Sequence, residues 1–345
     1  MPLRENSELI EFVAPLLDEA ITTVGEQEYI RLRRAADDDA QVAENATEAV
    51  KSLALMQYGR QPAFNEWDAL FYITDYQPGH INFALQVLEG LIQEAPDGLA
   101  GKPSLHIINV GCGALAVQFA VAILAAVYNV DGATIVVKGI DTRPAMKVIG
   151  TTLWKQFRTL VDRYPKLSAL SHACDGLTTR AEVYDSYASF WRAATSPPPA
   201  DAPPECWLVS LDPVFEANKD EIAGALQTLH ERYSDNVRLA ACFDLTLEID
   251  RCVPRGGLQF KRPRKEMLPF QGKLPITSKW REELVAELSK LPQNAYSRNV
   301  AGLLQIPVIW PGRLICRGSI TTRRDATLHD RANTTIPASS SPGTP

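Results

Sequence analysis

A glycine turn between a strand and a helix constrains the fold of this chain more than any other feature. Residues 104–110 are apolar and β-branched, as in a buried strand, and residues 114–128 continue as an apolar helix. Between them, Gly111 lets the backbone turn sharply out of the strand. Gly113 has no side chain, so a ligand can approach the main chain near the positive end of the helix. The segment therefore predicts a ligand-binding turn.

Strands and helices alternate beyond this turn. Three further apolar segments have the pattern of buried strands, with helical patterns between them: residues 134–140, 206–211 and 237–243. Such alternation implies an open, mostly parallel sheet covered by helices on both faces. Two late strands are expected at residues 303–309 and 313–320. The predicted fold class is therefore α/β with a Rossmann-like sheet.

Three parts are expected along the chain. Apolar residues recur at helical spacing over residues 1–100, which predicts an all-helical N-terminal region. The α/β domain covers residues 101–321, in which the proline-containing stretch 163–205 is expected to be a surface insertion. Residues 322–345 are rich in Thr, Arg, Ser and Pro, which predicts a disordered tail.

An acidic residue closes the second predicted strand. Asp141 lies 28 residues past Gly113. In a right-handed strand–helix–strand unit the ends of the two strands lie side by side, so this carboxylate can accept hydrogen bonds from ribose hydroxyls. Together, the glycine turn and Asp141 predict a nucleoside-containing ligand.

Two cofactor classes fit this pattern. Residues 111–116 satisfy the permissive dinucleotide fingerprint, with alanine in its third place. Against a dinucleotide, the acid comes later than the usual spacing of about twenty residues. We also find no Tyr-x-x-x-Lys pair for hydride transfer. An NAD(P)-dependent oxidoreductase therefore stays an alternative.

Over residues 100–250 the chain resembles the class I S-adenosylmethionine-dependent methyltransferases. The resemblance lies in the strand, the Gly111-Cys112-Gly113 turn and Asp141. It implies a Rossmann-like methyltransferase sheet in which Gly111, Cys112 and Gly113 hold the methionine end of S-adenosylmethionine. It also implies that Asp141 binds the ribose and that Asp175, expected after the third strand, reads the adenine.

The segment after residues 206–211 resembles the Asp-Pro-Pro-aromatic motif of enzymes that methylate exocyclic or amide nitrogens. It reads Asp212-Pro-Val-Phe215, with Val214 in place of the second proline. The resemblance implies that Asp212 orients a planar amino group towards the sulfonium, while Phe215 stacks on a flat acceptor. An Asp-Pro pair also starts ordinary turns, so a turn without a functional role stays an alternative.

The end of the helical region contains a second polar segment. Tyr58-Gly-Arg60 and Tyr76-Gln-Pro-Gly-His80 resemble, more faintly, segments of the mitochondrial ribosome-associated methyltransferase-like family, although that family's cysteine clusters are missing. We expect Tyr76 and His80 to face the cofactor and bind substrate. The Pro-Gly pair can equally serve to start a helix.

Composition limits the partners. The net charge is −6, the six cysteines include no Cys-x-x-Cys pair, and the longest apolar run is too short to span a bilayer. With no signal-peptide core at the N-terminus, we expect a cytoplasmic protein without a metal or a membrane. Seven Lys and Arg residues lie within 251–273. They suit either a nucleic-acid backbone or a solvated loop, and we favour the loop.

The sequence thus favours an S-adenosylmethionine-dependent methyltransferase. Its acceptor is open and includes a nitrogen of a nucleobase, of an amide or of a small metabolite, with nucleic acid among the candidates. Besides the oxidoreductase, a catalytically silent scaffold or assembly factor of the same fold stays an alternative. The oligomeric state is also open.

Overall fold

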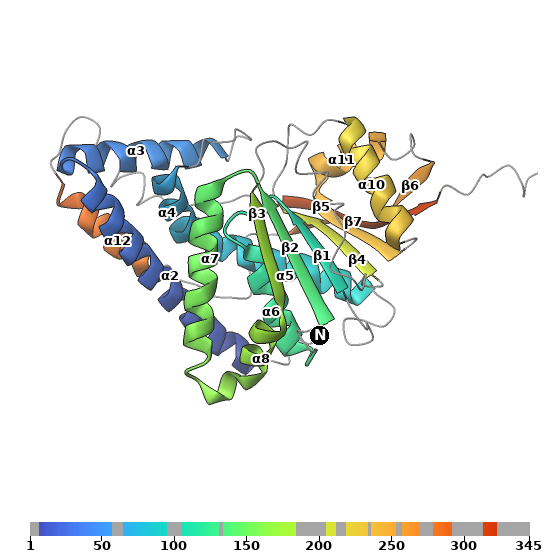
Figure 1. Ribbon diagram of the computed structural model, residues 1–345, viewed down its shortest axis with the longest axis horizontal. Helices are drawn as coiled ribbons and strands as arrows, with labels where there is room; N and C mark the ends of the chain where they lie inside the picture. Colours follow the sequence, from blue (N-terminus) through green and yellow to red (C-terminus); the bar gives the residue numbers. More distant parts are fainter. Residues whose placement is uncertain are drawn as a thin grey trace, which may run out of the picture.

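The computed structural model describes ten stretches of the chain, which form a sheet with helices packed on it (Figure 1). They are residues 7–56, 65–94, 105–130, 134–183, 205–211, 219–233, 236–252, 257–268, 279–291 and 313–322. The strand predicted at 303–309 and the tail predicted beyond Thr322 lie outside the described residues.

The seven strands form one sheet in the order β3-β2-β1-β4-β5-β7-β6. Strands β1 to β5 are parallel, and β7 is antiparallel to both of its neighbours. The strands are β1 (Leu105–Val110), β2 (Ile135–Asp141), β3 (Thr178–Val183), β4 (Glu205–Ser210), β5 (Val237–Cys242), β6 (Leu258–Leu268) and β7 (Arg313–Thr322). This mostly parallel sheet confirms the predicted α/β fold class.

The strand order reverses between β1 and β4, because the chain runs outwards through β2 and β3 before it returns to β4. In open parallel sheets, ligands bind outside the carboxyl ends of the strands at such a reversal. Val110 pairs with Ile140 of β2, and Asn109 pairs with Val209 of β4. The glycine turn, Asp141 and the end of β4 therefore lie at the same edge of the sheet.

Helices connect the parallel strands in right-handed crossovers, which place α6 and α7 on one face and α10 on the other. The helices are α6 (Ala116–Val127), α7 (Pro144–Val161), α8 (Ser168–Gly176), α10 (Lys219–Tyr233) and α11 (Phe243–Cys252). Phe119 of α6 packs edge-on against Trp154 and Phe157 of α7, with ring centroids 5.0 and 5.3 Å apart. Pro144 begins α7, as its fixed φ favours.

The predicted N-terminal helices are present in the described residues and share one hydrophobic core with the sheet. They are α2 (Ser7–Ala35), α3 (Asp39–Met56), α4 (Glu66–Asp75) and α5 (Gln77–Glu94). Helix α5 packs on α6, and α2 packs on α7. Figure 1 shows α2, α3 and α4 on the left, α5 near the middle and strands β5 to β7 on the right.

A late helix, α12 (Lys279–Ser289), joins the N-terminal region and packs against α2 and α4. Its Trp280 lies over Gly25 of α2, next to the ring of Tyr29 at a centroid distance of 6.2 Å. Its Arg281 donates from Nε to the buried carboxylate of Asp75, at 2.6 Å. An aromatic contact and an ion pair thus join α12 to the N-terminal helices α2 and α4.

Two predictions about the middle of the chain are wrong in part. The expected surface insertion contains α8 and β3 up to Val183, while its proline-containing residues 184–204 lie outside the described residues. The expected solvated loop at 251–273 contains the edge strand β6. Among the described strands, β6 pairs with β7 alone, and charged residues are common on such edge strands. Within the described residues, no helix is long and apolar enough to cross a membrane.

The packing of Trp280 predicts that Gly25→Ala destabilises the protein. A Cβ at position 25 would lie 2.3 Å from Nε1 of the buried Trp280 ring, so the indole must move. We expect a loss of about 1–3 kcal/mol in the free energy of unfolding, measured by urea denaturation. Gly224→Ala on α10 is the matched control, because no atom lies within 4 Å of its Cβ position. A helical alanine there stabilises by about 0.5–1 kcal/mol. Equal effects at the two sites would contradict the packing of α12 on α2.

Asp75 predicts a pH dependence of stability. Burial raises the pKa of its carboxyl group to about 6, against the opposing effect of Arg281. The folded protein therefore holds this proton more tightly than the unfolded chain, so the contribution to stability falls as pH rises from about 4 to about 6 and then stays constant. Relative to Asp75→Asn, the wild type should lose up to about 3 kcal/mol over that interval in urea titrations. If the free energies of unfolding of the two proteins change with pH in parallel, the raised pKa of Asp75 is refuted.

Candidate functional site

The glycine turn at the end of β1 is held against β2 by its own backbone. Gly111 and Gly113 have φ values of 70° and 50°, in the left-handed region that favours glycine. The N–H groups of Gly111 and Cys112 both donate to the carbonyl of Ile140, at 2.9 and 3.0 Å. The turn is thus fixed directly beside Asp141, the next residue of β2.

Asp141 contacts the turn, as the sequence predicts. Its Oδ2 accepts a hydrogen bond from the N–H of Gly113 at 2.7 Å, and its Oδ1 accepts from the N–H groups of Thr142 and Arg143 at 2.8 and 3.0 Å. The side chain of Arg143 adds two more hydrogen bonds, from Nε to Oδ1 at 2.6 Å and from Nη2 to Oδ2 at 2.7 Å. The carboxylate is 2% exposed and fully satisfied within the chain.

Cys112 is buried in the middle of the turn. A Cβ at Gly139 of β2 would lie 3.0 Å from the Sγ of Cys112, so the thiol faces the sheet. Burial raises the pKa of this thiol well above its usual value, and the nearby Asp141 charge acts in the same direction. The thiol therefore stays protonated, and its orientation leaves the main chain of Cys112 as the part that can face a ligand.

Three stacked rings from the helical region cover the turn. The hydroxyl of Tyr72, on α4, lies 3.0 Å from the place that a Cβ of Gly113 would occupy and 3.0 Å from Nδ1 of His80. The Tyr72 ring stacks on both Tyr76 and His80, with centroids 5.9 and 5.3 Å away. Tyr76 and His80, the predicted substrate-binding residues, are both buried and are held next to the turn by Tyr72. A direct contact between either residue and a substrate stays a prediction.

Sequence reasoning missed Tyr72. Its signal is its spacing, since it precedes Tyr76 by four residues and His80 by eight, which is typical of one helical face. The end of α4 at Asp75 does not break this stack. Tyr72 also crowds position 113, because a Cβ there would lie 3.0 Å from its hydroxyl, and the φ of 50° favours glycine as well.

Two buried amides lie beside the turn with unsatisfied atoms. Gln77 donates from Nε2 to the carbonyl of Ala114 at 2.8 Å, but its Oε1 has no hydrogen-bond partner among the described residues. Gln118, in the first turn of α6, has neither amide atom paired within the same residues. Buried polar groups are nearly always paired with protein or water, so we expect a ligand or water to pair with these atoms.

The other predicted site residues do not join this cluster. Asp175 lies on α8, which precedes β3, so it is at the opposite edge of the sheet from the glycine turn. There its side chain is 54% exposed and forms an ion pair with Arg158. The prediction that Asp175 reads adenine after the third strand is therefore wrong. Asp212 and Phe215 lie outside the described residues.

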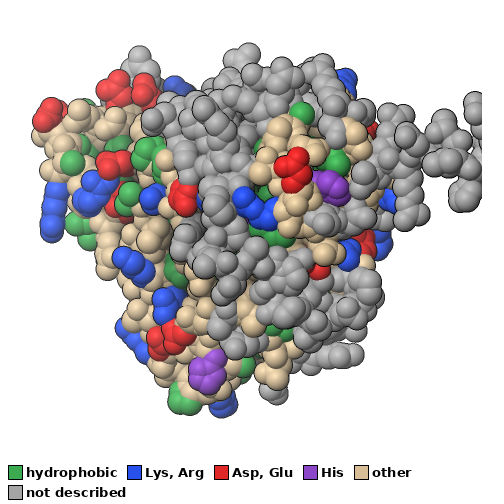
Figure 2. All heavy atoms as spheres, turned by 45° about the vertical axis from the view of Figure 1, so that its right-hand side comes forward, with side chains coloured by type: hydrophobic (Ala, Val, Ile, Leu, Met, Phe, Trp, Pro, Cys, Tyr) green, Lys and Arg blue, Asp and Glu red, His purple; other side chains and the backbone are tan. Residues whose placement is uncertain are grey.

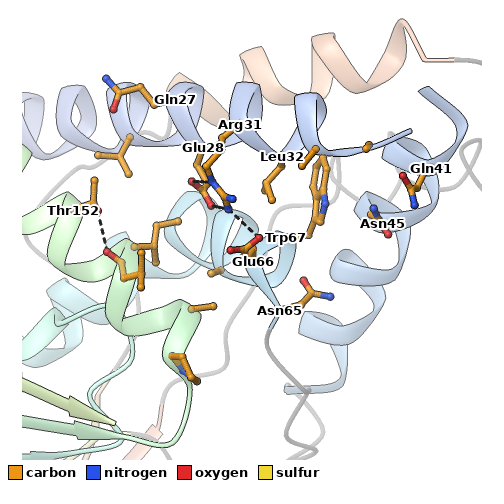
Figure 3. Close-up of a pocket in the computed structure, with 18 residues that line it drawn as sticks. Gln27, Glu28, Arg31, Leu32, Gln41, Asn45, Asn65, Glu66, Trp67 and Thr152 are labelled. Atoms are coloured by element: carbon orange, nitrogen blue, oxygen red, sulfur yellow. Dashed lines mark hydrogen bonds and ion pairs between the residues drawn. The ribbon is translucent and has the colours of Figure 1, made fainter. Parts of the chain in front are cut away.

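A groove of about 990 Å³ lies between α2, α3, α4 and the side of α7 that faces away from the glycine turn (Figure 3). Arg31 of α2 pairs with Glu28 of the same helix at 2.6 Å and with Glu66 of α4 at 3.0 Å. Gly150 of α7 faces the other way, because its Cβ position is 2.8 Å from the backbone of Ala114. The groove and the glycine turn are thus separated by α7.

Surface charge and metal ligands add little to the site. On the face drawn in Figure 2, acidic and basic side chains of the described residues are interspersed and do not form a basic track. Within the described ranges, no group of three or more His, Cys, Asp or Glu side chains could hold a metal ion.

Comparisons with known proteins give similarity in structure only. Neither a family model nor a curated protein matches the sequence. A cyclopropane-fatty-acyl-phospholipid synthase-like protein from Lactobacillus casei has 15% identity, with 71% of this chain and 91% of that one covered and a TM-score of 0.37. The magnesium protoporphyrin IX methyltransferase of Synechocystis, solved with bound S-adenosylhomocysteine, has 13% identity, coverages of 82% and 99%, and a TM-score of 0.37.

A third similar structure is a protein from Listeria monocytogenes described as a class I S-adenosylmethionine-dependent methyltransferase. It has 12% identity, coverages of 91% and 88%, and a TM-score of 0.38. At such low identities and TM-scores, these similarities say nothing about the ligand or the substrate of this chain. The evidence for a cofactor is therefore the geometry around Asp141.

The buried Asp141–Arg143 pair predicts a large cost for Asp141→Asn. The substitution removes the charge that Arg143 contacts while its guanidinium stays largely buried. Breaking such a pair costs about 3–5 kcal/mol, so we expect a loss near the lower end in urea denaturation without ligand. Asp175→Asn is the control: it breaks an exposed pair with Arg158 and should cost less than about 1 kcal/mol. Similar small losses in both variants would show that the carboxylate of Asp141 is not held as described.

Proposed function

We propose that this chain is an S-adenosylmethionine-dependent methyltransferase whose cofactor binds where β1 and β2 end. The observation that carries the proposal is the 2.7 Å hydrogen bond from the N–H of Gly113 to the carboxylate of Asp141. It joins the glycine turn to an acid suited to ribose hydroxyls, at the strand-order reversal of the sheet.

The residues around the turn fit the parts of this cofactor. The main chain of Gly111, Cys112 and Gly113 would hold the methionine end, and Asp141 would accept from the ribose. The buried Oε1 of Gln77, which has no hydrogen-bond partner among the described residues, is an acceptor suited to the amino group of the methionine part. When bound, the cofactor supplies a methyl group on a sulfonium, ready for in-line transfer.

The acceptor would enter next to β4. This strand is the neighbour of β1 on the other side of the order reversal, and Asp212 follows it by two residues. Asp212 would hold an amino group by accepting its hydrogen bond, and Phe215 would stack on a planar acceptor. Transfer of a methyl group needs positioning and exclusion of water more than acid–base chemistry, and the buried Tyr72–Tyr76–His80 stack would exclude water beside the turn.

Calorimetric titration with S-adenosylmethionine and S-adenosylhomocysteine tests this proposal. We expect dissociation constants in the micromolar range for the wild type. Asp141→Ala should weaken binding about 100-fold, because it removes two charge-assisted hydrogen bonds. Asp175→Ala, at the opposite edge of the sheet, should bind like the wild type.

NADH and NADPH serve as comparison ligands in the same titrations. Binding of a reduced dinucleotide without either sulfur ligand would replace the methyltransferase proposal by an oxidoreductase. Absence of binding by every ligand would point to a silent scaffold of this fold. Circular dichroism of each variant ensures that lost binding is not lost folding.

A further inference from the structure

The side chain of Arg143 occupies the carboxylate that the proposed function assigns to ribose. Its Nε and Nη2 contact the two oxygens of Asp141 side-on, at 2.6 and 2.7 Å. This is the bidentate geometry in which a guanidinium pairs most strongly with a carboxylate. Arg143 is the residue just before α7, two positions after Asp141, so the pair forms within a single short turn.

The guanidinium presents the same pattern of donors as a ribose. Two parallel N–H groups meet the two carboxylate oxygens here, and the two neighbouring hydroxyls of a ribose would donate to the same two oxygens. An ionised carboxylate has about four acceptor positions. Three backbone N–H groups and the two guanidinium donors, five in all, already exceed that number. A ribose therefore cannot be added to this arrangement and must replace the guanidinium.

The remaining contacts of Asp141 support replacement. The N–H groups of Gly113, Thr142 and Arg143 belong to the backbone, so they keep the carboxylate in position when the Arg143 side chain leaves. The side chain of Arg143 is 16% exposed while that of Asp141 is 2% exposed, so the arginine lies on the solvent side of the pair. Among the described groups that contact Asp141, the Arg143 side chain is the one that has to move.

From this geometry we infer that Arg143 is an internal competitor of the cofactor's ribose and sets the affinity of the site. The inference rests on the proposed function. It differs from a purely structural role, in which Arg143 would neutralise the buried acid and hold it for the ligand. The competitor role predicts tighter binding when Arg143 is removed, whereas the structural role predicts unchanged or weaker binding.

Calorimetric titration of S-adenosylhomocysteine into the wild type, Arg143→Ser and Arg143→Lys separates these roles. We expect Arg143→Ser to bind at least about tenfold more tightly than the wild type. Arg143→Lys should lie between them, because a lysine ammonium cannot make the side-on fork. Arg158→Ser is the control. It removes an arginine of α7 that pairs with the exposed Asp175, so this variant should bind like the wild type.

Thermal unfolding gives a second readout that does not depend on activity. Without ligand, Arg143→Ser should unfold at a lower temperature than the wild type, because Asp141 loses its partner. With saturating S-adenosylhomocysteine, it should gain more in unfolding temperature than the wild type gains. Opposite changes in stability and affinity are the signature of an internal competitor.

Different results would overturn this inference and the proposed function. If the wild type binds S-adenosylhomocysteine and both Arg143 variants bind equally or more weakly, Arg143 is not a competitor, while the proposed function stands. If neither the wild type nor any folded variant binds, the proposed function fails and this inference fails with it. If Arg143→Ser does not fold, the titration of Arg143→Lys decides between the two roles.

Discussion

The hydrogen bonds that join the glycine turn to the end of β2 determine the arrangement of the site. The carbonyl of Ile140 accepts from Gly111 and Cys112, and Asp141 accepts from Gly113. These contacts fix where β1 ends and α6 begins. Through Thr142 and Arg143 the same carboxylate also fixes the start of α7. The two crossovers that flank the candidate cofactor site therefore begin from one buried carboxylate.

The N-terminal helices belong to this site and are not an independent addition. Tyr72 of α4 reaches Gly113, and Gln77 of α5 bonds to Ala114. Helix α12, from near the other end of the chain, holds α4 through the ion pair between Arg281 and Asp75. The helices that pack against the glycine turn are therefore held in place by residues from distant parts of the chain.

How much the sequence could predict depended on how local each signal was. The strand, the glycine turn and Asp141 lie within one short unit, so their pattern predicted the fold class and placed the acid beside the turn correctly. Strand β3 was missed because its residues, Thr178 to Val183, are partly exposed and mostly polar. That omission put Asp175 on the wrong side of the third strand. Tyr72 was missed because its importance comes from a contact between segments about forty residues apart.

The proposed site requires that Asp141 binds ribose once Arg143 leaves it. A crystal structure of the protein with bound S-adenosylhomocysteine tests this most directly. We predict that both ribose hydroxyls lie within hydrogen-bond distance of the Asp141 carboxylate, that Gly113 keeps its bond to that carboxylate, and that the Arg143 guanidinium has turned away. A bound ligand with the Arg143 fork still in place on Asp141 would contradict the account.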